Sequence, residues 1–231
     1  LYQSWCSELM VLRTTRISDG APVAGVLPLR SPEVMMADTV SEQLTKSQAA
    51  RRERAIRAAL ELGAEGGYDA VQMRDVAQRA DIALGTLYRY FSGKDHLLAA
   101  ALVEWVNDLE QRVSLKPPKG ETTADRMVDI LRRATRAMEK EPKLSAAVVT
   151  ALSSPDPQVA QCQQDIAQAM LRIQSRAFPE DFDPALKARI IRALGHVWFS
   201  SLVGWVNGWV GITQAGDELD VAAHLMLDQY S

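Results

Sequence analysis

Residues 79–98 read RADIALGTLYRYFSGKDHLL, and they join two short helical patterns through the turn Asp81-Ile82-Ala83. Two helices connected by so short a turn have the spacing of a helix-turn-helix, whose second helix enters the major groove of DNA. The second helix, expected over 84–90, carries two tyrosines beside Arg89, and Lys94 follows it. This stretch therefore predicts a recognition helix that meets a phosphate backbone.

Capping signals place nine helices along the chain. The first helix is expected to end at about Glu65 before a glycine pair, the eighth at about Val210 and the ninth near Tyr230. Three helices are expected to start at capping boxes, which pair Thr45 with Gln48, Ser92 with Asp95, and Thr122 with Asp125. Two are expected to start near Gln72 and near Leu84, and one at Pro142. The remaining three are expected to start at the pairs Asp156-Pro157, Asp183-Pro184 and Gly216-Asp217.

The composition favours an all-α globular protein. Of the 231 residues, 47% are hydrophobic and 24% are charged, and glycine and proline are sparse inside the periodic segments. No apolar run reaches the ~20 residues that span a bilayer, so no membrane partner is expected. Two cysteines, Cys6 and Cys162, are too few for a disulfide framework and fit a reducing cytoplasm. The three histidines lack metal-ligand spacing, so neither a metal nor a cofactor is expected.

The charge is distributed unevenly. The whole chain carries −3, but residues 46–94 hold nine Lys and Arg against six acidic residues and therefore carry +3. A basic segment on an acidic protein favours a localised contact with a polyanion. Residues 1–45 hold several prolines and glycines without a sustained period. We expect them to be a disordered leader or an overlong start, with a regulatory arm as the alternative, and we place a DNA-binding domain at 46–98 and a second helical domain at 99–231.

Within 46–98, each candidate residue has an expected role. Gly85 lets the backbone approach DNA closely, and Thr86 offers a hydroxyl and a methyl to base edges. Arg89, Tyr90 and Lys94 are expected to grip phosphates, whereas Phe91 is expected to pack in the small core together with Tyr88. The full set of expected DNA-binding residues is Gln72, Arg74, Leu84, Gly85, Thr86, Tyr88, Arg89, Tyr90 and Lys94.

The stretch VQMRDVAQRADIALGTLYRYFSGKDHLL resembles the DNA-binding signature of the TetR repressor family, and the likeness covers about 51–98. Two positions depart from the family pattern. Gln72 stands where Thr is usual, and it can still donate a hydrogen bond. Asp81 stands where the turn usually has glycine, and Asp tolerates a positive φ better than most residues. The resemblance implies three DNA-binding helices followed by six helices that bind an effector and dimerise.

Within that family, three segments resemble the KstR-type sterol (cholesterol) catabolism repressors of mycobacteria and their relatives. They are GGYDAVQMRDVAQRADIALGTLYRYF, RAMEKEPKLSAAVVTA and VWFSSLVGWV. This resemblance implies repression of lipid and cholesterol degradation genes, binding to an operator that is an inverted repeat in double-stranded DNA, and relief by a steroid acyl-CoA thioester.

The second domain contributes an expected effector pocket and an expected homodimer interface. Apolar residues on its helices suit either a core or an adaptable pocket, and four cations, Arg132, Arg133, Arg136 and Lys140, suit either a solvated face or the phosphates of CoA. The expected pocket residues are Met127, Leu131, Met138, Val149, Leu152, Met170, Ile173 and Trp198. The expected dimer residues, which the resemblance implies on the eighth and ninth helices, are Val197, Ser201, Gly204, Trp205 and Gly208.

Three alternatives remain at this point. A repressor of the same fold could control a fatty-acid or efflux operon and respond to a fatty acyl-CoA or an apolar drug. A helical adaptor could keep a vestigial DNA-binding domain, which the intact Gly85, Thr86, Tyr90 and Lys94 argue against. An enzyme is unsupported, because the sequence carries no phosphate-binding glycine loop, nucleophile elbow or metal-ligand spacing.

Overall fold

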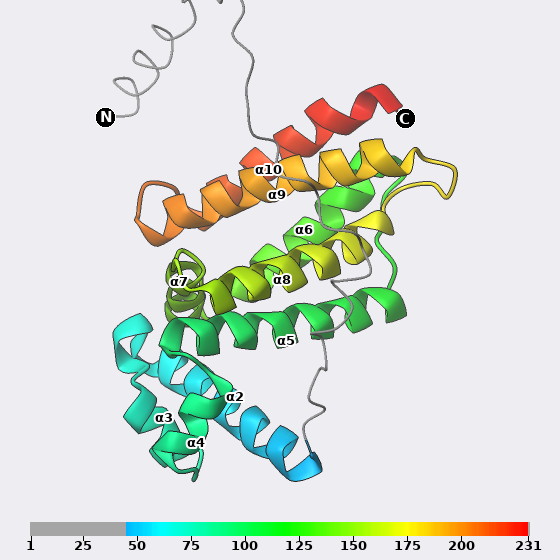
Figure 1. Ribbon diagram of the computed structural model, residues 1–231. Helices are drawn as coiled ribbons and strands as arrows, with labels where there is room; N and C mark the ends of the chain where they lie inside the picture. Colours follow the sequence, from blue (N-terminus) through cyan, green and yellow to red (C-terminus); the bar gives the residue numbers. More distant parts are fainter. Residues whose placement is uncertain (1–44, 231) are drawn as a thin grey trace, which may run out of the picture. The chain divides into compact units, whose positions relative to one another are not determined.

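The computed structural model describes residues 45–230, so the expectation of a disordered leader or overlong start falls almost wholly outside the described residues. Within them the chain forms nine α-helices and no strand (Figure 1). None of these helices is long and apolar enough to cross a membrane. The helices are α2 (Lys46–Gly66), α3 (Met73–Arg79), α4 (Leu84–Tyr90), α5 (Lys94–Leu115), α6 (Thr123–Glu139), α7 (Pro142–Ala151), α8 (Pro157–Ser175), α9 (Pro184–Val206) and α10 (Ile212–Leu227).

Helices α2, α3 and α4, with the first turn of α5, make up the part that we call the head (residues 46–98). The predicted capping box of Thr45 with Gln48 opens α2, and Gly67 ends it with a φ of 74°. Only glycine adopts this conformation at no steric cost. Between α3 and α4, Asp81 takes a φ of 51°, which is the positive φ expected at this turn.

The core of the head continues into later helices. Leu87 of α4 and Phe91 are 0% and 1% exposed, and they belong to a cluster that also holds residues of α7 and α8. Helix α5 packs against α2 on one side and against α7 and α8 on the other. In Figure 1 it lies between the head and the remaining helices. A shift in α7 or α8 therefore reaches the head through shared packing.

The rest of the chain, residues 99–230, is called the effector domain below. Its main core joins residues of α5, α6, α8, α9 and α10, and α10 packs on both α6 and α9. The predicted signals hold at three helix starts. Thr122 forms a capping box with Asp125, and Asp156 and Asp183 each cap a helix that has proline in its first turn.

Three helix boundaries differ from the predictions. The N-cap of α5 is Gly93, not Ser92, because Ser92 and Asp95 bond to other parts of the chain. Helix α9 ends at Val206, four residues earlier than expected, since the backbone turns at Gly208 with a φ of 74°. Helix α10 begins at Ile212, so the predicted start at Gly216 lies inside it.

Candidate DNA interface and effector-binding core

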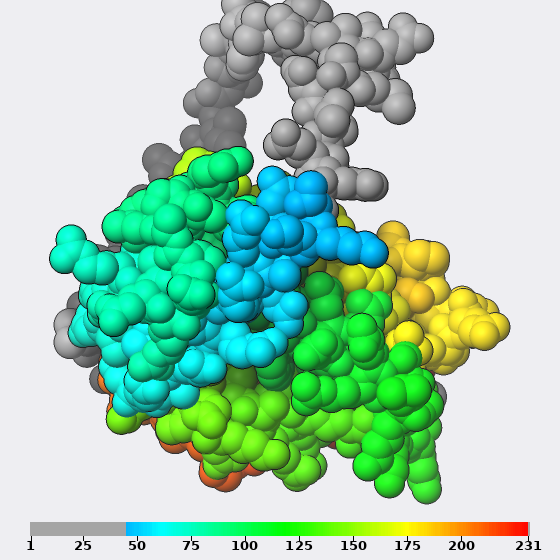
Figure 2. Space-filling view, turned by 90° about the horizontal axis from the view of Figure 1, so that it is seen from below, coloured from blue at the N-terminus to red at the C-terminus, as the bar shows by residue number. Residues whose placement is uncertain are grey.

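The recognition helix α4 is exposed along most of its length. Leu87 is its one buried residue, while Gly85 lies open, with no atom within 4 Å of where a Cβ would stand. Thr86 is half-buried and Leu84 is at the border of exposure. Figure 2 looks at the molecule from the end that carries α2, α3 and α4, where these helices form one continuous surface beside α5. An exposed face this poor in bulky aliphatic groups suits close approach to another backbone.

The aromatic residues on and just after α4 differ from the prediction in which of them are buried. Phe91 lies in the core as expected, but Tyr88 does not, because its side chain is 53% exposed. The prediction of Tyr88 as a core residue was therefore wrong, whereas its place among the DNA-facing residues stays a prediction. Tyr90 is half-buried and meets the edge of Phe91 at 6.4 Å between ring centroids. It packs against the core of the head, so only part of its side chain remains for a phosphate.

Two arginines of the head are exposed and make no ion pair or side-chain hydrogen bond among the described residues. They are Arg74 and Arg89, whereas most other arginines of the head make such a contact. Arg79 pairs with Glu65 at 2.7 Å, and Arg52 pairs with Glu104 at 2.5 Å. The Arg79 guanidinium lowers the pKa of the Glu65 carboxyl. Arg74 and Arg89 are therefore the arginines of this surface that are ready to bind a phosphate.

Lys94 and Gln72 lie at the starts of α5 and α3, as predicted, but both also make internal contacts. The Nζ atom of Lys94 lies 3.7 Å from the ring centroid of Tyr68 and 3.4 Å from its carbonyl oxygen. The hydroxyl of Tyr68 donates to Asp95 at 2.5 Å, and burial together with this bond raises the pKa of Tyr68 to about 12. The amide of Gln72 donates to the carbonyl of Asp69 at 2.8 Å. Lys94 therefore also links the start of α5 to Tyr68, which lies between α2 and α3.

The predicted pocket residues are all buried or half-buried, but they do not line one open cavity. Four of them, Met127, Leu131, Met170 and Ile173, lie in the main core of the effector domain. Met138 and Val149 form a smaller cluster with Leu202, and Leu152 belongs to the cluster that includes the core of the head. Trp198 packs against both the main core and the smaller cluster. An enclosed hollow beside Leu131, between α6 and α10, has a volume of only ≈ 10 Å³.

Two polar atoms are buried in the effector domain without a partner among the described residues. They are Oε1 of Gln174 on α8 and Nε1 of Trp198 on α9. Gln174 is 1% exposed, and its helical neighbours Met170, Ile173 and Ala177 belong to the main core. A buried polar group without a hydrogen bond costs about 1–3 kcal/mol. Sequence analysis missed Gln174, because one glutamine among the six of α8 carries no periodic signal.

Two of the four predicted cations on and just after α6 are paired within the chain. Arg132 bonds Asp220 of α10 at 2.6 Å, and Arg133 pairs with Asp129 and donates to the carbonyl of Lys116 at 2.7 Å. The exposed Arg136 and Lys140 have no ion pair among the described residues. Two of the four predicted cations thus remain for a phosphate.

Two of the predicted dimer residues, Ser201 and Gly204, are occupied within the chain. Ser201 is buried and donates to Glu218 of α10 at 3.0 Å. A Cβ on Gly204 would stand 3.1 Å from Val210, so this glycine serves the turn back towards α10. Gly208 lies beyond the end of α9. Val197 and Trp205 are half-buried, and they also pack within the chain.

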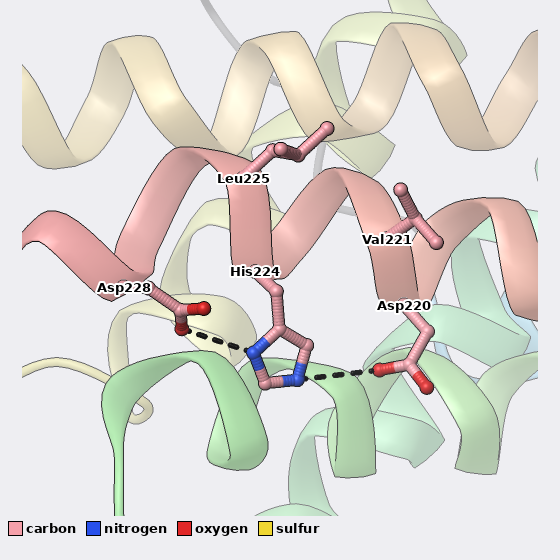
Figure 3. Close-up of a pocket in the computed structure, with 5 residues that line it drawn as sticks. All are labelled: Asp220, Val221, His224, Leu225 and Asp228. Carbon is pink, nitrogen blue, oxygen red and sulfur yellow. Dashed lines mark hydrogen bonds and ion pairs between the residues drawn. The ribbon is translucent and has the colours of Figure 1, made fainter.

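Helices α9 and α10 present other apolar residues to solvent. Phe199, Val221 and Leu225 are exposed, Leu225 by 77% of its surface. A shallow hollow of ≈ 510 Å³ lies along α10. Among its lining residues, His224 bonds Asp228 at 2.9 Å, and its other nitrogen lies 3.5 Å from Asp220. Figure 3 shows the ring of His224 between these two carboxylates. Exposed apolar residues on two adjacent helices are typical of an interface between proteins.

Comparisons with known proteins identify both parts of the chain. The model for bacterial regulatory proteins of the tetR family matches residues 55–101, and that for the tetracyclin repressor-like C-terminal domain matches residues 120–226. The HTH-type transcriptional repressor KstR of Rhodococcus jostii is 36% identical over 86% of this chain and 93% of its own length. The repressor KstR of Mycobacterium tuberculosis is 32% identical over 81% of this chain and 85% of its own length.

Solved structures agree with this match. A TetR transcriptional regulator from Rhodococcus sp. superposes with a TM-score of 0.73 at 31% identity, over 80% of this chain and all of its own. The repressor FadR of Thermus thermophilus, solved in complex with lauroyl-CoA, superposes with a TM-score of 0.61 at 22% identity. That match covers 76% of this chain and 92% of the other. At 22% identity the likeness extends to the fold alone.

Proposed function

Since the chain belongs to the TetR family of bacterial regulators, and is a DNA-binding transcriptional repressor rather than an enzyme, we propose that an acyl-CoA thioester releases it from DNA. The thioester we favour carries a steroid, and the genes it controls serve sterol and lipid catabolism. In this proposal the repressor acts in the cytoplasm, as a homodimer on an inverted repeat.

The observation that supports the DNA contact is the surface of α4. Gly85, Tyr88 and Arg89 are exposed on a helix that is held to the head through Leu87. Arg89 and Arg74 would bind phosphates and fix the orientation of α4, while Leu84, Gly85 and Thr86 would meet base edges. In a dimer, two such helices would stand one turn of DNA apart, ~34–36 Å.

The buried residues of the effector domain support an apolar effector with a few polar atoms. Gln174 could accept a hydrogen bond from the effector and Trp198 could donate one, which would relieve both unpartnered atoms. Arg136 and Lys140 are exposed cations that suit the phosphates of CoA. Likeness to the two KstR repressors, over more than four fifths of this chain, favours the steroid.

A fatty acyl-CoA is the second candidate, and one observation favours it. Two structural neighbours, both regulators named FadR, were solved in complex with lauroyl-CoA and stearoyl-CoA. An alkyl chain offers no polar atom to a buried amide along its length. The unpartnered Gln174 and Trp198 therefore fit an oxygenated ring system better.

The proposed release is a shift between two conformations. Because the enclosed hollow between α6 and α10 is so small, an effector would have to part the packed helices to enter. It would then favour a conformation with altered spacing of the two α4 helices, and could shift the equilibrium only by its difference in affinity for the two states. Helix α5 packs on both α2 and α8 and would carry the change.

Fluorescence anisotropy on duplex DNA from the upstream region of the gene tests this function. It would be run at several salt concentrations with no effector, a steroid acyl-CoA or stearoyl-CoA. We expect tight, salt-dependent and sequence-selective binding that the steroid thioester releases. Release by stearoyl-CoA alone would replace the effector class and keep the repressor. Release by neither thioester would contradict the effector class as a whole.

A further inference from the structure

Ser92 lies immediately after the recognition helix. Helix α4 ends at Tyr90, and its C-cap Phe91 donates its N–H to the carbonyl of Leu87 at 3.0 Å. The side chain of Phe91 is buried in the core of the head. Whatever fixes the backbone at Ser92 therefore fixes the C-terminal end of α4 to within two residues.

The side chains of two residues bond to Ser92. Its backbone N–H donates to Nδ1 of His96 at 3.1 Å, and the ring of His96 lies edge-on to Phe91 with centroids 5.4 Å apart. Its hydroxyl donates to Oδ2 of Asp156 at 2.5 Å. His96 belongs to the next helix along the chain, whereas Asp156 is 64 residues away.

Asp156 belongs to the effector domain, where it is the N-cap of α8. Its Oδ1 atom accepts from the N–H of Gln158 at 2.8 Å, so the two oxygens of one carboxylate are divided between α8 and Ser92. These two bonds, that of Ser92 first, lower the pKa of Asp156. Helix α8 packs extensively on α5, and its far end carries the buried Gln174.

The second bond of Asp156 is not needed for capping. Asp183 caps α9 in the same Asp-Pro sequence, and its Oδ1 atom accepts from the N–H of Leu186 at 2.6 Å. Among the described residues, Asp183 makes no other side-chain hydrogen bond or ion pair. Asp156 thus has one side-chain contact that Asp183 lacks. This contact is the bond from Ser92, which lies two residues after the end of α4.

We propose that Asp156 is a positioning residue for DNA recognition: it fastens the C-terminal end of α4 to the N-terminus of α8, so that the position of α8 sets that of α4. The role in DNA recognition rests on the repressor function proposed above. An effector that displaces α8 would then act on α4 directly, in addition to any movement of α5.

Three variants separate this role from helix capping. Ser92→Ala removes the bond and leaves α8 untouched. Asp156→Thr keeps a good N-cap, but its one side-chain oxygen takes the capping position of Oδ1 and leaves no oxygen where Oδ2 accepts from Ser92. Asp183→Thr makes the same change at the matched cap and serves as the control. Asp156→Asn, which can cap α8 with its oxygen and donate to Ser92 with its amide, should restore most of the wild-type behaviour.

Two measurements on the full chain test whether Asp156 positions α4. Amide hydrogen exchange over residues 87–92 should become faster in Ser92→Ala and in Asp156→Thr, and not in Asp183→Thr. Affinity for duplex DNA from the upstream region should fall about five- to tenfold in the same two variants, the size of one ordinary hydrogen bond. Combining Ser92→Ala with Asp156→Thr should add no further loss, because both remove one interaction.

The proposal is overturned if Ser92→Ala and Asp156→Thr match Asp183→Thr in both exchange and affinity. A wild-type protein that binds no DNA selectively would instead remove the repressor function. In that case the exchange of residues 87–92 would still decide whether Asp156 positions α4, since that measurement needs no DNA.

Discussion

The head and the effector domain differ in what their interiors leave without partners. Among the described residues, both parts have unpaired cations on the surface, such as Arg89 in the head and Arg136 in the effector domain, but only the effector domain has unpartnered polar atoms in its interior, on Gln174 and Trp198. A partner can reach the head without any rearrangement. A partner of the effector domain has to open packed helices first. The site expected on the head is therefore open at the surface, whereas the site expected in the effector domain is closed by packed helices.

The largest expected effect concerns how α4 is held. Leu87 is the single buried residue of α4, so Leu87→Ala should lower the free energy of unfolding by about 2–5 kcal/mol. Urea denaturation followed by circular dichroism measures it. Leu115→Ala is the control, because Leu115 is 87% exposed. Equal stability of the two variants would mean that α4 is not held by the shared core.

The next effect tests the unpaired surface cations. Arg89→Ala should weaken DNA binding roughly fivefold and reduce the slope of log affinity against log salt by about 1, because one phosphate contact is lost. Stability should not change. Arg112→Ala, at an exposed arginine near the end of α5, should leave the salt slope as in the wild type. A wild-type slope in Arg89→Ala as well would remove Arg89 from the interface.

An effect of similar size compares two turns with positive φ. Gly208→Ala in the effector domain should cost about 1–2 kcal/mol, because its φ is 74° and only the backbone opposes a Cβ there. Asp81→Gly in the head should change stability by less than about 0.5 kcal/mol, since relief at φ 51° is offset by a more flexible unfolded chain. Thermal unfolding of both variants measures the contrast. A large loss in Asp81→Gly would show that its side chain, and not its backbone, maintains the turn.

The smallest effect is a pH dependence at His96. Burial lowers the pKa of His96 in the folded protein. The histidine of the unfolded chain has a pKa of about 6.5, so below that pH the unfolded chain binds more protons than the folded one. Its contribution to stability is therefore complete above that pH and is lost as the pH falls towards the folded pKa. Unfolding of the wild type and of His96→Gln between pH 7.5 and 5.5 should show a shallower fall in the variant. Parallel curves would contradict this assignment.

Features fixed by local chemistry could be predicted from the sequence. The bounds of α4, the capping boxes of Thr45 and Thr122 and the positive φ of Asp81 each depend on residues a few positions apart. The helix-turn-helix followed from the same short-range signals.

Features that depend on distant contacts could not be predicted in this way. Ser92 and Asp95 have capping-box spacing, but Asp156 and Tyr68, which are 64 and 27 residues away, bind them instead. The burial of Gln174 likewise depends on how other helices surround α8. A pattern within one helix does not contain that information.

The length of α5 sets how sensitive this repressor could be. Its 22 residues extend for about 33 Å, so tilting the helix by about 5° about one end displaces the other end by about 3 Å. Successive base pairs in a duplex are about 3.4 Å apart. In the proposed dimer, a tilt of this size would therefore put a recognition helix almost one base pair out of register with its operator.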